Sequence, residues 1–290
     1  MRNIDFSLCR SWLFIGGPDA RAETASCGAD AVILEFEDFT PPEARPAARA
    51  AAPELLRAWK AAGAVTAVRI NPLGQDGGAD LAAAMAGAPD VVMLPKVRGP
   101  GDISELAAAV VEQERLIGRV GGTRLVPNIE SAAALFQTRE IAAADPRVIG
   151  CLLASEDLTA DLGAPRTRAG GEIAFARAYF HAACVAAGVL SIDYPYTFAD
   201  EAGLLESCAG AKALGYRAKS LVAPAHAAPV NTAMMPSAKE VAAAQRTVAA
   251  FDAARAAGQD RVLLDGHLVE VPTYLNARAL LARAAAYRSP

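Results

Sequence analysis

The chain has 290 residues, of which 53% are hydrophobic and 21% are charged, so it can bury a sizeable apolar core. Its formal charge is -4 and its basic residues are scattered, which argues against nucleic acid as a partner. The longest apolar runs fall well short of the roughly 20 residues needed to cross a bilayer, and the N-terminus lacks the pattern of a secretory signal. We therefore expect a cytoplasmic protein without a membrane partner. None of the five cysteines forms a CxxC pair, so we expect neither a disulfide framework nor a zinc site built on thiolates.

Short β-branched runs alternate with alanine-rich stretches through most of the chain, which is typical of parallel strands joined by crossover helices. The predicted strands span residues 11–17, 31–38, 67–71, 91–97, 124–130, 148–157, 190–196 and 218–224. Eight such strands match an α/β fold of the (β/α)8 TIM barrel type, which takes ~250 residues. A doubly wound sheet is the competing fold, but the turn IGGPDARAE after the first strand lacks the G-x-G-x-x-G spacing. The sequence therefore predicts a barrel catalytic domain over residues 1–233.

The pattern changes after the eighth strand, and residues 234–290 read as a helix-hairpin-helix appendage. The segment RVLLDGHLVEVP lies between two helical stretches, and Asp265-Gly266 in its centre is a strong signal for a two-residue hairpin turn. An appendage of this kind often serves as a lid or as an oligomer contact.

Ionisable side chains gather at the C-terminal ends of the predicted strands, where barrel enzymes place their active sites. A charge at the mouth of a barrel is unfavourable unless it is paired, hydrated or bound to a metal. Acids outnumber bases at these positions, which favours a site for a cation. The polar strand ends are Glu35, Glu37, Asp38, Arg69, Asn71, Lys96, Glu130, Glu156, Asp157 and Asp193.

Glu130 and Asp157 come from neighbouring predicted strands, so their carboxylates can converge on one ion. An oxygen-rich site with few protein ligands is typical of Mg²⁺. Structural alternatives stay open for the other residues: Arg69 can form a core ion pair, and Lys96 and Glu156 can each pair with a structural partner. Asp161 lies in a turn that starts a helix, where a capping role is favoured over a ligand role.

Eight motifs in chain order resemble the citrate lyase β-subunit-like (HpcH/HpaI aldolase/citrate lyase) family of the phosphoenolpyruvate- and pyruvate-utilising (β/α)8 superfamily. They are RSWLFIGGP, GADAVILEFEDFTPPEAR, VRINPLG, VVMLPKV, PNIESAAAL, ASEDLTADLG, IDYPYTFADEAGL and LLDGHLVEVP. Together they cover nearly the whole chain, which makes the resemblance specific even though each single motif is weak.

The resemblance implies that Glu130 and Asp157 hold Mg²⁺, with Mn²⁺ as a second candidate. Glu156 is expected to support this metal site without binding the ion itself. The resemblance also implies that Arg69 binds substrate and acts in catalysis, and that Glu270 is the second catalytic residue. The family carries an aspartate where this chain has Glu270, whose arm is longer by one methylene. Among the other polar strand ends, we expect Glu37, Asp38, Asn71 and Lys96 to bind substrate.

The implied reaction is cleavage or formation of a malyl-, citramalyl- or citryl-type thioester, with an acetyl thioester and a 2-oxo acid as the other partners. The expected ligands are a 2-oxo or hydroxy acid and a thioester of coenzyme A or of an acyl carrier protein. The family habit implies a homo-oligomer, a trimer or a hexamer. The chain departs from the family at Gly16, Ala223 and Glu270. Two alternatives therefore stay open: an aldolase for free 2-oxo acids, and a catalytically impaired paralogue that binds metal and oxo acid.

Overall fold

Eight parallel strands close into a barrel in this computed structural model, which describes residues 4–119 and 121–288. Each strand is hydrogen-bonded to the next in the sequence, and β8 returns to pair with β1. The predicted (β/α)8 barrel is therefore confirmed. The strands are β1 (Ser11–Gly16), β2 (Ala31–Glu35), β3 (Val65–Arg69), β4 (Val91–Leu94), β5 (Arg124–Ile129), β6 (Gly150–Leu153), β7 (Leu190–Asp193) and β8 (Ala218–Leu221).

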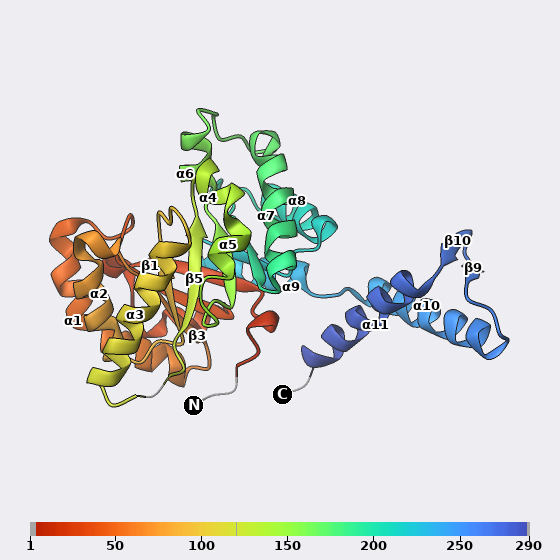
Figure 1. The fold of residues 1–290 in the computed structure, drawn as a ribbon, viewed down its shortest axis with the longest axis horizontal. Coiled ribbons are helices and arrows are strands. Elements are labelled where there is room, and N and C mark those ends of the chain that lie inside the picture. Colours follow the sequence, from red (N-terminus) through yellow and green to blue (C-terminus); the bar gives the residue numbers. More distant parts are fainter. Residues whose placement is uncertain (1–3, 120, 289–290) are drawn as a thin grey trace. The chain divides into compact units, whose positions relative to one another are not determined.

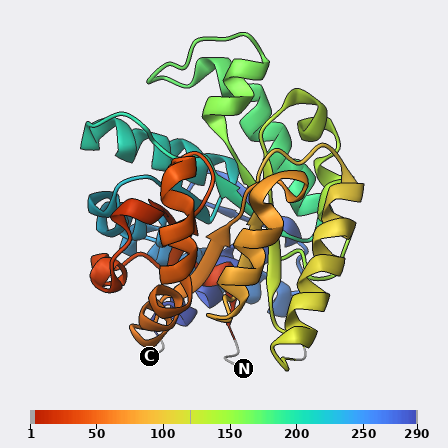
Figure 2. The same ribbon diagram turned by 90° about the vertical axis from the view of Figure 1, so that its left-hand side faces the viewer.

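Helices surround the strands, as Figures 1 and 2 show. Their amphipathic faces cover the outside of the barrel, so the strands are buried on both sides. The helices of the barrel region are α1 (Arg45–Ala61), α2 (Gly78–Met85), α3 (Pro100–Leu116), α4 (Ala132–Phe136), α5 (Thr138–Ala142), α6 (Ser155–Asp161), α7 (Ala174–Ala187), α8 (Glu201–Leu214) and α9 (Ala227–Met234). In the described part of the chain, no helix is both long and apolar enough to span a membrane.

Alternate residues of the strands point into the barrel and fill it with apolar side chains. Trp12 and Phe14 of β1 pack there with Ile33, Met93 and Val126, all of them buried. The inner layer also contains small residues, such as the alanines at the starts of β2 and β8, which leave room for the Trp12 indole. The lower part of the barrel is thus a packed core, and polar chemistry is confined to its C-terminal end.

The sixth strand is shorter than the sequence pattern predicts. It ends at Leu153, and Glu156 and Asp157 lie in the first turn of α6 instead of in the strand. Carboxylates are favourable at this position because the first turn of a helix leaves its backbone N–H groups unpaired and carries a partial positive charge. The prediction that both acids belong to the strand is therefore wrong, although they still lie at the C-terminal end of the barrel.

Asp193, one of the polar strand ends, belongs to a buried ion-pair cluster outside the barrel. Its carboxylate accepts hydrogen bonds from Lys219 Nζ at 2.7 Å and from Arg177 Nε at 2.9 Å and Nη2 at 2.7 Å. Lys219 is fully buried and also donates to the backbone oxygen of Tyr194 at 2.6 Å and to Ser207 Oγ at 3.0 Å. Burial lowers the pKa of Lys219, and the Asp193 charge opposes that shift. The cluster attaches β7 and β8 to the covering helices α7 and α8.

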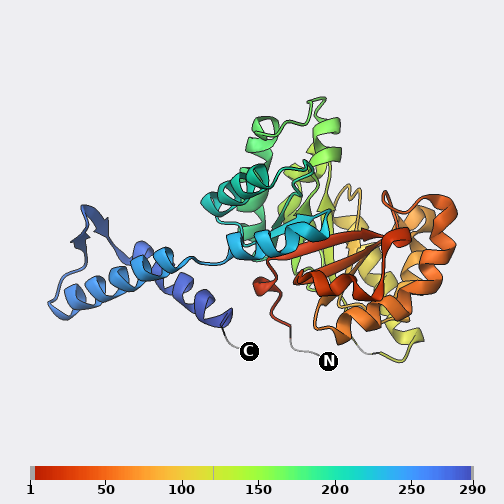
Figure 3. The same ribbon diagram turned by 180° about the vertical axis from the view of Figure 1, so that it is seen from behind.

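The C-terminal segment forms a second compact unit. The first unit ends at Thr232 and the second begins at Ala233. The second unit contains α10 (Ala238–Ala256), the antiparallel pair β9 (Val262–Leu264) and β10 (His267–Val269), and α11 (Val271–Ala286), which Figure 3 shows in blue. Asp265 and Gly266 connect the two strands with φ values of 51° and 80°, and such left-handed pairs are typical of a tight hairpin turn. The helix-hairpin-helix prediction is confirmed, while a lid or oligomer role stays a prediction.

Replacing Asp193 by Asn should destabilise the fold strongly. The variant keeps the shape of the side chain but leaves two buried cations, Lys219 and Arg177, without their carboxylate. Breaking a buried ion pair on one side costs about 3–5 kcal/mol. Urea unfolding followed by circular dichroism would measure this loss. Glu112→Gln is the control, because its ion pair with Arg115 is exposed and its removal should leave the midpoint unchanged. Equal midpoints for both variants would contradict the structural role of the cluster.

Candidate active site

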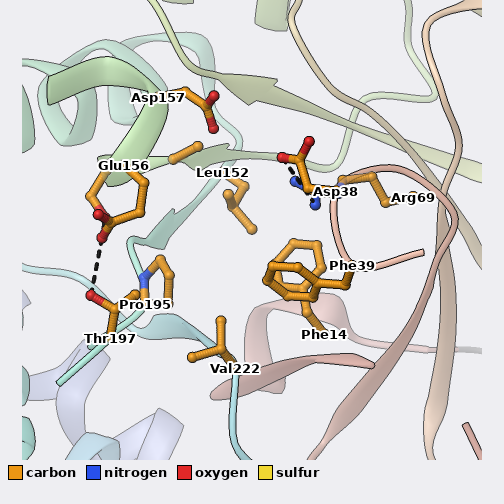
Figure 4. Close-up of a pocket in the computed structure, with 12 residues that line it drawn as sticks. Phe14, Asp38, Phe39, Arg69, Leu152, Glu156, Asp157, Pro195, Thr197 and Val222 are labelled. Carbon is orange, nitrogen blue, oxygen red and sulfur yellow. Dashed lines mark hydrogen bonds and ion pairs between the residues drawn. The ribbon is translucent and has the colours of Figure 1, made fainter. Parts of the chain in front are cut away.

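A pocket of about 360 Å³ opens at the C-terminal end of the barrel (Figure 4). Apolar and polar side chains lie next to one another around it. The apolar side chains include Phe14, Phe39, Leu152 and Val222, and the polar ones include Asp38, Arg69, Glu156, Asp157 and Thr197. The pocket therefore combines an apolar surface with a small number of charged groups, as is typical of binding sites for small molecules.

Arg69 enters the pocket from the last position of β3 and is held there by carboxylates. Its Nε lies 3.0 Å from Glu35 Oε1, and its Nη1 lies 3.4 Å from Glu37 Oε2. The guanidinium group also lies over the Phe14 ring, 4.8 Å from the ring centroid. Burial lowers the pKa of Arg69, but the surrounding carboxylates outweigh this effect and raise the pKa above its ordinary value. Arg69 is thus a permanent, well-oriented positive charge, and the predicted core ion pair exists alongside its place in the pocket.

Glu35 is a buried strand-end residue that the sequence pattern does not assign to the site. Besides Arg69, its carboxylate accepts hydrogen bonds from the backbone N–H groups of Glu37 at 2.6 Å and Phe39 at 2.7 Å. One side chain therefore shapes the loop after β2 and orients Arg69. Burial raises the pKa of Glu35, while Arg69 opposes the shift. The signal in the sequence is the register, because Glu35 lies two residues after the inward-facing Ile33.

Lys96 and Glu37 form an ion pair above the end of β4. Lys96 has a φ of 52°, which is unusual for a residue with a side chain and points its ammonium group back to Glu37. Burial raises the pKa of Glu37, and Arg69 and Lys96 both oppose this shift. The Lys96 side chain is half exposed and is not part of the lining of the candidate pocket. The structural alternative for Lys96 is realised in this ion pair, and the substrate-binding roles of Lys96 and Glu37 stay predictions.

Asp38 and Asn71 lie in different surroundings. Asp38 is half exposed at the pocket rim, with its Oδ2 3.9 Å from Arg69 Nη2. Asn71 is buried, and its Nδ2 donates to Asp80 Oδ2 at 2.8 Å and to the backbone oxygen of Phe36 at 2.9 Å. Both amide protons of Asn71 are therefore used within the protein. Substrate binding by either residue stays a prediction.

Glu130 and Asp157 are the predicted ligands of a cation, and that role stays a prediction. Glu130 directly follows β5, is 4% exposed, and has no hydrogen-bond partner for either carboxylate oxygen. Burial raises its pKa to about 8; Arg69 opposes this shift, and the nearby Glu37 and Asp157 add to it. A buried acid surrounded by other acids is unfavourable unless a cation or a proton neutralises it. The donor set fits Mg²⁺, which takes one or two carboxylates and completes its shell with waters or substrate oxygens.

The described residues contain no group of three or more His, Cys, Asp or Glu side chains able to hold a metal ion. Two carboxylates without a third protein ligand are unsuited to a closed structural zinc site. They do suit a cation that shares its shell with a bound ligand, and they leave positions for that ligand's oxygens.

Glu156 turns away from Asp157 toward the loop that follows β7, as Figure 4 shows. Its Oε1 accepts hydrogen bonds from Thr197 Oγ1 at 3.0 Å and Ser155 Oγ at 3.2 Å, and it lies 3.3 Å from Arg166 Nε. Glu156 therefore connects α6 to the loop beyond β7 at one side of the pocket. Its support of a metal site stays a prediction.

Two further acids lie outside the pocket lining. Asp161 is the last residue of α6, so its predicted place in a turn that starts a helix is wrong. Its Oδ2 accepts a hydrogen bond at 2.8 Å from the backbone N–H of Ala132 at the start of α4. Glu270 belongs to the second compact unit, where it is exposed and directly precedes α11. The catalytic role of Glu270 stays a prediction.

A comparison with protein-family models matches residues 10–224 to the model described as HpcH/HpaI aldolase/citrate lyase. The chain belongs to this family. It is 35% identical to citrate lyase subunit beta of Escherichia coli (strain K12), with 95% of this chain and 93% of that protein covered. It is 30% identical to L-malyl-CoA/beta-methylmalyl-CoA lyase of Cereibacter sphaeroides (strain ATCC 17025 / ATH 2.4.3), with 92% of each chain covered.

A solved structure has the same architecture. The structure of protein CitE from Mycobacterium tuberculosis, in complex with magnesium, acetoacetate and coenzyme A, superposes with a TM-score of 0.77. That protein is 30% identical, and the match covers 95% of this chain and 98% of the other. The resemblance inferred from the eight sequence motifs is therefore confirmed at the level of the family.

Replacing Glu130 by Gln should alter how stability depends on pH in the metal-free protein. The pKa of Glu130 is about 8 in the folded chain, against an ordinary value of 4.5. Between these two values the folded state binds the proton more tightly than the unfolded state, so Glu130 makes stability fall as the pH rises through this window. Above and below it, Glu130 adds no pH dependence.

We therefore expect Glu130→Gln to be more stable than the wild type at about pH 9 and to show a flatter profile down to about pH 5. Urea unfolding in the presence of a chelator would measure both profiles. Glu140→Gln, which removes an exposed carboxylate on α5, is the control. Parallel profiles for Glu130→Gln and the wild type would contradict the burial of an unpaired carboxylate.

Proposed function

We propose that this protein is a Mg²⁺-dependent carbon-carbon lyase that cleaves or forms a malyl-, citramalyl- or citryl-type thioester. The products of cleavage are an acetyl thioester and a 2-oxo acid. The observation that carries the proposal is the unpartnered, buried carboxylate of Glu130 beside Asp157, close to the oriented cation Arg69. The names of relatives support the thioester, since they include citrate lyase subunit beta and a malyl-CoA lyase.

Glu130 and Asp157 would hold the cation in this proposal, with Mn²⁺ as an alternative to Mg²⁺. The ion would supply Lewis acidity and a template for the oxygens of the hydroxy or oxo acid. A solved relative contains magnesium together with acetoacetate and coenzyme A, which supports both the choice of ion and the class of ligand. The raised pKa of Glu130 implies that cation binding displaces a proton near neutral pH.

Arg69 would stabilise the oxygen on which negative charge develops as the carbon-carbon bond breaks or forms. Its guanidinium group needs little reorganisation for this task, because Glu35 and Glu37 already hold it in place. Its guanidinium group lies over the aromatic rings of Phe14 and Phe39, which keep water from that side and so strengthen its electrostatic effect.

Cleavage breaks the bond between the hydroxyl-bearing carbon and the carbon next to the thioester. The hydroxyl loses its proton and becomes the carbonyl of the oxo acid, and the acetyl thioester gains a proton at its methyl group. We assign the exchange of the methyl proton to Glu270, supplied by the C-terminal unit of the same or a neighbouring subunit. A homo-oligomer, a trimer or a hexamer, belongs to this proposal, as does a cytoplasmic location.

The proposal is tested by incubating the purified protein with malyl-, citramalyl- and citryl-CoA in the presence of Mg²⁺ or Mn²⁺. We expect Mg²⁺-dependent release of glyoxylate, pyruvate or oxaloacetate together with acetyl-CoA, and no release in the presence of a chelator. Coupled assays for the oxo acid and a thiol reagent for free coenzyme A distinguish cleavage from simple hydrolysis.

Three outcomes would contradict the proposal. Release of free coenzyme A without an oxo acid would indicate hydrolysis. Turnover of free hydroxy-oxo acids without any thioester would indicate an aldolase. Calorimetric binding of oxo acids without turnover of any thioester would indicate a protein that keeps the binding site and has lost the reaction.

Replacing Glu270 by Gln should lower kcat by about 10²–10⁴-fold, the usual contribution of a general acid-base group. KM should change little, because the metal and Arg69 remain. Glu270→Asp, which shortens the arm by one methylene, is the matched comparison and should retain more activity than Glu270→Gln. Steady-state kinetics with the best thioester substrate would measure both. Unchanged kcat in Glu270→Gln would remove this residue from the mechanism.

A further inference from the structure

Asn128 is the last inward-facing residue of β5, and Glu130 follows two positions later, directly after the strand ends. Val126 of the same strand belongs to the core inside the barrel, and side chains two residues apart share one face of a strand. Asn128 therefore points into the barrel directly below Glu130. It pairs in register with Leu152 of β6, and Leu152 lines the pocket. Asn128 is not itself part of the pocket lining, and it lies beneath that lining, next to Leu152.

Asn128 is fully buried, and neither its Nδ2 nor its Oδ1 has a hydrogen-bond partner within the protein. Buried polar groups are almost always paired, so each exception calls for an explanation. An apolar residue would fit the surroundings better, because the other inward-facing residues at this level include Met93, Leu152 and Ile192. The strand thus carries an amide where packing alone favours a hydrocarbon.

The neighbouring donors of the site are already engaged. Arg69 is held by Glu35 and Glu37, Lys96 pairs with Glu37, and both amide protons of Asn71 are used. Asn128 differs from these groups because it offers two protons and an acceptor without a charge. A neutral donor of this kind can fix the orientation of an oxygen without altering the charge balance of the acids around it.

We propose that Asn128 is a substrate-binding residue whose Nδ2 donates a hydrogen bond to an oxygen of the bound 2-oxo acid. The inference rests on the proposed function, because it takes the oxo acid as the ligand of the Glu130 and Asp157 site. A 2-oxo acid carries three oxygens at one end, and two of them suffice to chelate a cation. The remaining oxygen needs a donor from the protein, and Asn128 lies next to Glu130 on the face that can provide one.

The side-chain amide of Asn128 should also affect the stability of the ligand-free protein. If the amide pairs only with the ligand, it is buried without a hydrogen bond in the ligand-free protein and lowers its stability. Removing it should therefore stabilise the fold and weaken ligand binding, a trade-off that is common at functional sites. If the amide has a purely structural role and pairs with a buried water, its removal should instead lower stability, because the water would lose its partner or a void would remain. The two readings therefore separate in an experiment that does not depend on turnover.

The experiment compares the wild type with Asn128→Leu, which keeps the branched shape, and with Ile129→Val on the opposite face of β5 as the control. Calorimetry in the presence of Mg²⁺ measures the affinity for glyoxylate, pyruvate and oxaloacetate, and thermal unfolding without ligand measures Tm. We expect Asn128→Leu to weaken binding of the preferred oxo acid about tenfold or more. We expect it to raise Tm by about 2–4 °C. Ile129→Val should leave the affinity unchanged.

Unchanged affinity in Asn128→Leu, or a Tm below that of the wild type, would overturn the inference. Absence of oxo-acid binding by the wild type would overturn it as well. If Asn128→Leu does not fold, Asn128→Ala removes the same amide without adding volume and carries the binding comparison. Failure of the proposed lyase reaction has a different signature, since the wild type would then bind oxo acids without cleaving thioesters and the effect of Asn128 on binding would persist.

Discussion

The ion pair between Arg69 and Glu35 is the interaction on which the candidate site depends. The two residues are register partners at the ends of adjacent strands, so the barrel itself brings them together. Glu35 also accepts two backbone N–H groups of the following loop, and that loop carries Glu37, Asp38 and Phe39. The position of the arginine, the course of the loop and one wall of the pocket therefore rest on one buried carboxylate.

The close approach of this loop to β1 explains a departure from the family pattern. A Cβ atom at Gly16 would lie 2.3 Å from the backbone oxygen of Phe39, so the glycine is needed where the loop crosses the end of the strand. Phe39 then packs edge-to-face on Phe14, with the ring centroids 6.3 Å apart, and both rings flank Arg69. Gly16 thus allows the loop that carries Phe39 to pack closely against β1 and form part of the pocket.

The acids of the site differ in how they are neutralised. Glu35 and Glu37 are paired with Arg69 and Lys96, and Glu156 is paired with Arg166 and Thr197. Glu130 differs from them because it is buried and forms no ion pair, and neither of its carboxylate oxygens has a partner that meets the geometric criteria of a hydrogen bond. The unpaired acid stands beside an unpaired amide, Asn128, and both are buried. Two buried polar side chains without hydrogen-bond partners, two residues apart in the chain, indicate a ligand-binding site more strongly than one such side chain would.

The barrel and the C-terminal hairpin could be predicted from the sequence, because the alternation of strands and helices and the Asp-Gly turn are local patterns. The same patterns predict the end of the barrel at which the charged residues gather. The sequence did not determine which charged residues pair, because ion pairs join residues from different strands. Asp193 shows this limit: the sequence places it among the polar strand ends at the mouth of the barrel, yet its side chain faces outward to Lys219 and Arg177. Only the tertiary structure decided that Glu35 orients Arg69 and that Glu130 and Asn128 have no partners, since burial and pairing arise when all eight strands close.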